Sequence, residues 1–281
     1  MNTRFLELKR RYDFSSAVAA VKSPLAPADT IKVPLPVSLK YLQTACSKIE
    51  LAYGLRGFVS CDGIDANPDY ASISLTHNPA CGEPENYSTL GCSKLSKEEH
   101  YYATPETLAK VGGARDSYYD TYGFRFPTSP AKNELGKLIG SLKRNLIRSR
   151  ISVIRAGAPG PSGFFWGWHK DEPVFENLRI NIHVTDSNSH KIQVMREDRM
   201  PAHPQDPAIR DHQFEAGFGY SWDTNLPHRA CAVGNPNHDR VAIILGVSPW
   251  FDLNAATGEW EPNEFFGVKH PHQMLLDGDI L

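Results

Sequence analysis

The sequence contains no apolar run that approaches the roughly 18 residues of a membrane-spanning helix. Its first residues, MNTRFLELKRRYDF, also lack the apolar stretch of a signal peptide. Net charge is small as well, −2 from 30 basic and 32 acidic residues. We therefore expect a cytoplasmic protein that has no general attraction to membranes or to nucleic acid. The sequence leaves the oligomeric state open.

Cysteines are few, five in number, and no two have the C-x-x-C spacing of a zinc or redox site. An odd number of cysteines favours free thiols in a reducing compartment. Glycine and proline are plentiful by contrast, with 21 of each among 281 residues, and they are spread along the chain. This distribution favours many short strands and turns over long helices.

Residues 1–148 are expected to form a helical and loop-rich support that also supplies elements of a substrate pocket. Helices are predicted over 3–22, 37–53 and 130–148, with a strand between 58 and 76 and a long loop over 80–100. The helix at 130–148 has the clearest pattern, because apolar residues recur at helical spacing: Leu135, Leu138, Ile139, Leu142, Leu146 and Ile147.

Residues 149–252 are predicted to form a β core, and 253–281 an irregular C-terminal tail of the same single catalytic domain, 1–281. Seven short strands separated by turn residues indicate a β-sandwich or barrel. Their sequences are RISVIRAG, GFFWGWHK, LRINIHVT, KIQVMRE, HQFEAGFGYSW, HRACAVG and VAIILGVSPWF.

One of these strands, LRINIHV, alternates strictly between apolar and polar residues. Leu178, Ile180, Ile182 and Val184 share one face. Arg179, Asn181 and His183 share the other. This alternation predicts a core that has a polar interior.

Three residues of the β region have the pattern of a metal site. His169 and Asp171 are two residues apart at a strand end, so their side chains project from the same face. His228 precedes another strand further along. Two histidines and one carboxylate form a facial triad that leaves coordination positions open, which is the arrangement of Fe(II) oxygenases.

Arg240 begins the apolar strand VAIILGV, from which it can reach back toward such a metal. Its planar guanidinium suits a carboxylate, as binding of 2-oxoglutarate requires. Each of these residues is a weak signal by itself. Their joint order within a run of short strands is the discriminating observation.

Residues 148–252 resemble the aspartyl/asparaginyl β-hydroxylase-like branch of the Fe(II)/2-oxoglutarate-dependent dioxygenases. The resemblance is carried by RSRISVIRAGAPGPSGFFWGWHKDEP, LRINIHV and GYSWDTNLPHRACAVGNPNHDRVAIILGVSPWF. It implies a mostly β fold with supporting helices around a double-stranded β-helix, the cupin-like jelly roll. It also implies Fe(II), 2-oxoglutarate and O2 as cofactor and cosubstrates, with release of succinate and CO2.

The resemblance further implies roles for single residues. His169, Asp171 and His228 match the metal ligands, and Arg240 matches the arginine that pairs with 2-oxoglutarate; Arg229 is a weaker substitute for it. Arg179 and His183 match residues that contact the cosubstrate or the substrate. The founding aspartyl hydroxylases lack a carboxylate ligand, so Asp171 places this chain nearer the small-molecule hydroxylases and argues against a halogenase.

A small polar molecule, amino-acid-like or anionic, is the expected substrate, because the polar strand face carries Arg and His. Further candidates for contacting it are Arg125, Tyr118, Tyr119 and Tyr122, although the segment 117–127 can equally pack outside a sheet. Three different functions stay open beside this one: a peptidyl or protein side-chain hydroxylase, a non-redox cupin-like isomerase or binding protein, and an inactive scaffold.

Several remaining residues have a plain structural interpretation. Trp166 and Trp168 either wall the pocket or simply pack, and Asp223 and Asn225 either orient His228 or cap a turn. Cys231 is expected to be a small packed thiol. The other histidines are expected to be exposed or to lie on a flexible terminus: His190, His203, His212, His238, His270 and His272.

Overall fold

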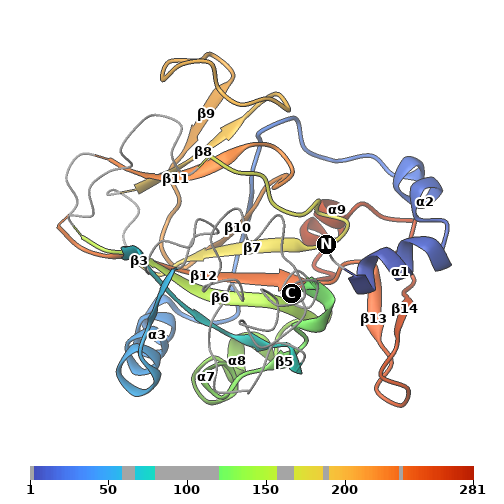
Figure 1. Ribbon diagram of the computed structural model, residues 1–281, viewed down its shortest axis with the longest axis horizontal. Helices are drawn as coiled ribbons and strands as arrows, with labels where there is room; N and C mark the ends of the chain where they lie inside the picture. Colours follow the sequence, from blue (N-terminus) through green and yellow to red (C-terminus); the bar gives the residue numbers. More distant parts are fainter. Residues whose placement is uncertain (1–2, 59–66, 80–119, 157–167, 186–189, 234–236) are drawn as a thin grey trace, which may run out of the picture.

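The computed structural model describes residues 3–58, 67–79, 120–156, 168–185, 190–233 and 237–281 (Figure 1). In chain order the elements are α1 (Thr3–Arg11), α2 (Phe14–Ala20), β1 (Ile31–Val33), α3 (Leu39–Tyr53), β2 (Arg56–Phe58), β3 (Asn67–Ser74), β4 (Thr76–His77), the 3-10 helix η2 (Thr121–Gly123), β5 (Phe126–Pro127), α7 (Ser129–Glu134), α8 (Gly136–Ile139), β6 (Leu146–Ile154), β7 (Leu178–His183), β8 (His190–Met195), β9 (Ile209–His212), β10 (Gly219–Ser221), β11 (His228–Ala232), β12 (Arg240–Val247), β13 (Phe251–Leu253), β14 (Trp260–Pro262) and α9 (Pro271–Leu276).

Two antiparallel sheets form the core. The large sheet has the order β1-β10-β7-β12-β6-β3-β2, and the small sheet has the order β11-β8-β9. After β6 of the large sheet, the chain passes the small sheet at a bridge beside β11 and returns to the large sheet in β7. It then forms β8 and β9 of the small sheet and β10 of the large sheet. Strand β11 of the small sheet and β12 of the large sheet follow. This alternation between two facing sheets is a double-stranded β-helix, so the predicted fold class is confirmed.

Three of the described helices cover the outer face of the large sheet. In Figure 1, α3, α7 and α8 lie beneath the large sheet, and the small sheet lies on its opposite side. The main hydrophobic cluster joins Leu42 and Ile49 of α3 to Leu138 of α8 and to the sheet residues Ile180 and Ile243. Its formation removes apolar surface from water and so fixes the large sheet on its helical layer.

The two faces predicted for 178–184 are found in β7. Leu178, Ile180 and Ile182 belong to the hydrophobic cluster against the helices. Arg179 and His183 are buried as well, on the opposite face of the strand. A polar interior between the sheets, as the alternation predicted, is therefore present.

The helix predicted over 130–148 is wrong in its second half. Helices α7 and α8 end at Ile139, and β6 begins at Leu146, where Leu146 and Ile147 pair with Val247 and Gly246 of β12. Glycine at 136 and 140 weakens a continuous helix, and the β-branched residues that follow suit a strand. The β core thus begins a few residues before position 149.

The C-terminal segment, predicted to be irregular, is ordered and packed. Strand β14 pairs with β13, and Trp260, Met274 and Ile280 belong to the main hydrophobic cluster. His270 caps α9 and Pro271 occupies its first turn, an arrangement that starts even a short helix. His270 and His272 are both buried, so the prediction of a flexible terminus is wrong.

The N-terminal part agrees with the predictions in outline. Helix α3 confirms the prediction for 37–53, with Ser38 as its N-cap, and β3 lies within the predicted strand region. The helix predicted over 3–22 is divided into α1 and α2, because the Asp13 side chain caps the second. Strand β1, in the proline-rich stretch, was not predicted. In the described residues no helix is long and apolar enough to cross a membrane.

Gly246 of β12 lies beside an irregularity in the pairing with β6, where no space is left for a side chain. A Cβ atom there would lie 2.6 Å from the carbonyl oxygen of Arg148 and 2.7 Å from Oδ1 of Asn177. Gly246→Ala should therefore lower the free energy of unfolding by about 2 kcal/mol, as other overpacked sites do. Gly136→Ala is the control: nothing lies within 4 Å of its added Cβ, so in α8 it should be neutral or stabilise by up to about 1 kcal/mol. Chemical denaturation measures both, and equal effects would contradict this account.

Candidate metal centre and polar interior

Backbone pairing brings the three predicted metal ligands together. His169 and His228 form an isolated antiparallel bridge, with the N–H of each donating to the carbonyl of the other at 3.1 and 2.9 Å. The N–H of Asp171 donates to the carbonyl of Thr224 at 2.9 Å. Residues that face each other across such a bridge project their side chains to one side. The fold therefore fixes both histidines and the carboxylate on one small surface.

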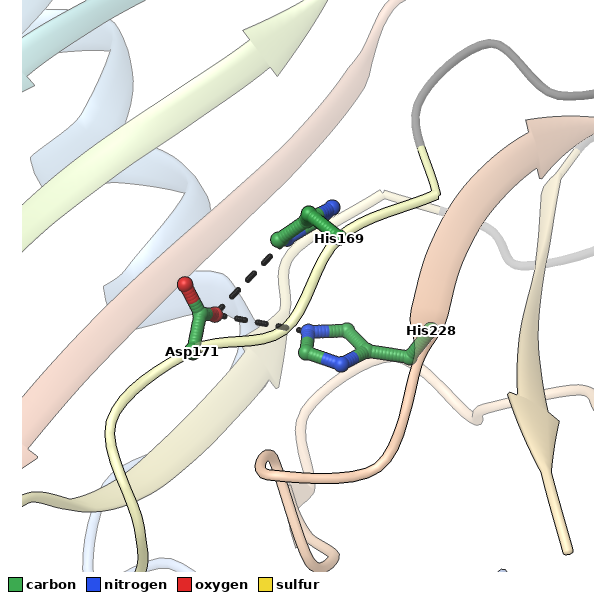
Figure 2. Close-up of side chains that lie close together, drawn as sticks. All are labelled: His169, Asp171 and His228. Carbon is green, nitrogen blue, oxygen red and sulfur yellow. Dashed lines mark ion pairs between the residues drawn. The ribbon is translucent and has the colours of Figure 1, made fainter. Parts of the chain in front are cut away.

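The three side chains point toward one another (Figure 2). Oδ2 of Asp171 lies 3.3 Å from Nε2 of His228 and 3.7 Å from Nε2 of His169. One ligand atom from each residue lies within 4.8 Å of the other two. Atoms that share one octahedral ion at bond lengths of about 2.1 Å are about 3 Å apart. The observed spacing is thus slightly wider than that of a filled site, and the donor set fits a divalent ion.

Solvent reaches the two histidines differently. The side chain of His169 is 51% exposed, whereas that of His228 is 6% exposed. Nδ1 of His228 lies 2.9 Å from the carbonyl oxygen of Leu226. Because a carbonyl only accepts, Nδ1 carries a hydrogen, and Nε2 is the ring nitrogen that faces Asp171. His228 is thereby prepared to act as a ligand.

Arg179 binds two neighbouring carboxylates. Its guanidinium donates to Oδ2 of Asp171 and to Oε2 of Glu172. Burial by itself raises the pKa of Asp171, but Arg179, and then His169 and His228, hold that pKa well below its ordinary value. Burial likewise raises the pKa of Glu172, and Arg179 again keeps it lowered. Both carboxylates are therefore ionised at neutral pH.

A second polar group lies further along β7. Nη2 of Arg240 lies 3.4 Å from Nε2 of His183. Arginine has no acceptor, so Nε2 of His183 accepts and the ring is neutral. Burial, then Arg240 and His190, lowers the pKa of His183 to about 2. Arg179 and His183 are four residues apart on one strand face, which separates their Cα atoms by about 13 Å.

Aromatic rings connect these two groups. The ring of Trp222 lies 5.6 Å from that of His228, and Phe214 lies 5.7 Å from Trp222 and 5.0 Å from His183. Tyr220 stacks on Phe214 at 4.0 Å. Together Phe214, Tyr220 and Trp222 form an apolar surface that extends from the metal ligand His228 to His183.

Some predicted pocket residues lie elsewhere. Tyr122 is fully buried in the main hydrophobic cluster and accepts a hydrogen bond from Ser248, so its candidacy as a substrate contact is wrong. Arg125 donates to the carbonyl of Gly258, in the turn between β13 and β14. Tyr118, Tyr119 and Trp166 lie outside the described residues.

Trp168, Asp223 and Cys231 have structural roles near the site. Trp168 packs in a small cluster beneath the guanidinium of Arg229. Asp223 accepts from the N–H of Asn225 and so caps a turn, while the backbone of Leu226 is what contacts Nδ1 of His228. Cys231 is a buried free thiol, as predicted.

The remaining histidines of the polar loops differ in exposure. His203 is exposed, as predicted, and His212 and His238 are half-buried. His190 is buried, so its predicted exposure is wrong. Burial, followed by Arg240 and His238, lowers the pKa of His190 to about 4.

Glu172 is the site residue that the sequence analysis missed. It follows Asp171 directly, and Thr121 donates to its Oε1 at 3.1 Å. A signal was present, because two adjacent carboxylates beside a strand with an inward arginine require a buried cation. Thr121 itself carried no such signal.

Comparison with known proteins adds little to this description. No protein-family model matches the sequence, and no curated protein matches it. Among solved structures it is similar to HygX from Streptomyces hygroscopicus with nickel and 2-oxoglutarate bound, at 8% identity over 85% of this chain and 93% of that one, with a TM-score of 0.41.

Two further solved structures give similar values. The non-haem α-ketoglutarate-dependent carbocyclase SnoK from nogalamycin biosynthesis has 14% identity, coverage of 84% and 88%, and a TM-score of 0.39. An oxidoreductase of the 2OG-Fe(II) oxygenase family from Burkholderia pseudomallei has 12% identity, coverage of 83% and 87%, and a TM-score of 0.37. Scores this low decide nothing about the chemistry of this chain, and the predicted branch of the family stays a prediction.

A divalent ion should stabilise the folded chain through the three ligands. At a Co(II) concentration about 100-fold above its Kd, binding should add about 2.7 kcal/mol to the free energy of unfolding and raise the Tm. Asp171→Ala and His228→Ala should lose most of this rise. His203→Ala, which changes an exposed histidine, should keep it. An equal rise in all four proteins, measured by thermal denaturation, would locate the ion elsewhere.

Proposed function

We propose that this chain is an Fe(II)- and 2-oxoglutarate-dependent oxygenase that hydroxylates, or otherwise oxidises, a C–H bond of a small polar metabolite. One observation carries the proposal: two imidazoles and one carboxylate converge inside a double-stranded β-helix. The set is the facial triad of non-haem Fe(II) oxygenases, in which half of the coordination positions stay open for other ligands.

His169, Asp171 and His228 would hold the iron. With Fe(II) and 2-oxoglutarate bound, such a centre oxidises a C–H bond with O2 and converts 2-oxoglutarate to succinate and CO2. The contribution of the chain is to fix the ligands before any ion arrives, through the His169–His228 bridge and the Thr224 carbonyl. Ligands fixed in this way need little rearrangement on metal binding.

Arg240 would bind the distal carboxylate of 2-oxoglutarate. It is buried at the start of β12, and its neighbour His183 is neutral, so its positive charge is not cancelled by that residue. In such a low-dielectric interior a charge-assisted pair with a carboxylate is stronger than at the surface. His183 would orient the guanidinium, and Phe214 and Trp222 would keep water from the cosubstrate.

The charges of the interior support an anionic or amino-acid-like substrate. Arg148 and Arg150 of β6 both lie close enough to the metal site to interact with its carboxylates. Arg148 lowers the pKa of Glu172, and Asp171 and Glu172 act on Arg150. Burial, and then Arg179, lowers the pKa of Arg150 to about 10, so it remains charged at neutral pH. This cationic surface beside the proposed iron site is complementary to a carboxylate or a phosphate.

The decisive experiment measures O2 consumption and succinate formation by the anaerobically purified protein supplied with Fe(II) and 2-oxoglutarate. We expect 2-oxoglutarate to stimulate O2 consumption, and anionic or zwitterionic metabolites to increase succinate formation further. Asp171→Ala should reduce both rates by at least 100-fold. Metal binding without any response to 2-oxoglutarate would favour a cupin-like isomerase or binding protein, and a response only to peptides would favour a protein hydroxylase.

Substitutions of Arg240 and Arg229 form a matched pair that tests which arginine binds 2-oxoglutarate. Removal of a charged hydrogen-bond partner costs about 1.5–3 kcal/mol, so Arg240→Met should raise the KM for 2-oxoglutarate by roughly 10- to 100-fold. Arg229 is also buried, but its Nε donates to Gln193 of β8, and Arg229→Met should leave this KM within about threefold. Steady-state kinetics on 2-oxoglutarate tests both variants. The reverse ranking would transfer the role to Arg229.

A further inference from the structure

A chain of partly buried polar contacts leads from the candidate metal centre to the 3-10 helix η2. It runs from Asp171 to Arg179, then to Glu172, and then to Thr121. We propose that Arg179 is a positioning residue of the metal centre, which Glu172 and Thr121 anchor so that the carboxylate of Asp171 is presented to the two histidines. This inference rests on the proposed function, because it requires that the triad binds a divalent ion.

The oxygen that Arg179 contacts gives the first argument. Nη1 of Arg179 donates to Oδ2 of Asp171, the same oxygen that lies 3.3 Å from Nε2 of His228 and 3.7 Å from Nε2 of His169. A carboxylate on a single Cβ can rotate, and a directed donor removes that freedom. Arg179 therefore fixes where a metal-binding oxygen would be found.

The anchoring of Arg179 gives the second argument. Its other terminal nitrogen, Nη2, donates to Oε2 of Glu172, and Oε1 of Glu172 accepts from the hydroxyl of Thr121 at 3.1 Å. Thr224 holds both carboxylate residues, since its hydroxyl donates to the Glu172 carbonyl at 2.8 Å and its own carbonyl accepts from the Asp171 N–H. Glu172 is thus held in place and anchors the guanidinium of Arg179.

The 3-10 helix η2 extends this anchor to the N-terminal helix. Thr121 is fully buried, and the preceding residue, Asp120, accepts from Nε of Arg4 at 2.7 Å. Helix α1 therefore contributes to the support of a residue that lies far from it along the chain.

The residue type gives the third argument. The planar fork of arginine can reach two carboxylates at once through separate nitrogens, whereas the single ammonium of lysine is a point charge. Arg144 shows the same pattern away from the site, where it donates to Asp252 and Glu264. A substitution by lysine keeps the charge in both places but removes the fork, so only the substitution at Arg179 should affect the metal.

The test measures Co(II) affinity by titration calorimetry and the visible absorption bands of bound Co(II), which report ligand geometry. Arg179→Lys and Glu172→Gln should each weaken Co(II) binding by roughly 10- to 100-fold, as the loss of residues that orient metal ligands does, and should shift the absorption bands. Thr121→Val, which removes only the hydroxyl contact, should have a smaller effect in the same direction. Arg144→Lys should leave the affinity and the bands unchanged.

The three site variants keep the inference testable if one of them does not fold. The decisive variants are whichever of Arg179→Lys and Glu172→Gln fold. If their Co(II) affinity stays within twofold of the parent value or becomes tighter, and their absorption bands are unchanged, the positioning role is overturned. A parent protein that binds no Co(II) would overturn this inference and the proposed function together. Weakened Co(II) binding in the variants, with no succinate formed by the parent, would support the positioning role and reject only the oxygenase activity.

Discussion

Reciprocal backbone hydrogen bonds between His169 and His228 are the constraint on which the site depends. They join a segment between β6 and β7 to the first residue of β11. Because the bridge is made by main-chain atoms, it sets the side toward which the Cα–Cβ bonds of both histidines point, whatever their rotamers. Asp171 then lies on the same side by strand alternation, and its N–H is held by Thr224.

The second constraint is that buried charges need partners. The buried arginines near the two ends of β7 have different kinds of partner. At one end, Arg179 is neutralised by two carboxylates, which offsets the desolvation of all three groups. At the other end, Arg240 lies against a histidine that stays uncharged. A protonated His183 would put two cations 3.4 Å apart in a buried place. Near one end of β7 the partners of Arg179 are carboxylates, and near the other end a neighbour of Arg240 is a neutral imidazole.

The strand pattern allowed much of this to be predicted from the sequence. Period-2 alternation in LRINIHV predicted the polar interior, and the spacing of His169, Asp171 and His228 predicted residues that the fold brings together. The failures share a physical cause. The apolar spacing of Leu142, Leu146 and Ile147 suits a helix, but pairing with β12 determines the structure there. Likewise, Thr121 reaches Glu172 only through tertiary packing, which no local pattern encodes.

The order of strands in the large sheet has a consequence for how the chain folds. Strand β12 lies between β6 and β7 and hydrogen-bonds to both, although it follows them by many residues. Strand β1 pairs with β10, from the opposite half of the chain. The sheet cannot close until residues near 240 are available, so its formation depends on contacts of long sequence separation. Folding should therefore be slow and strongly cooperative. During synthesis, β6 and β7 should remain unpaired and exposed until β12 has been made.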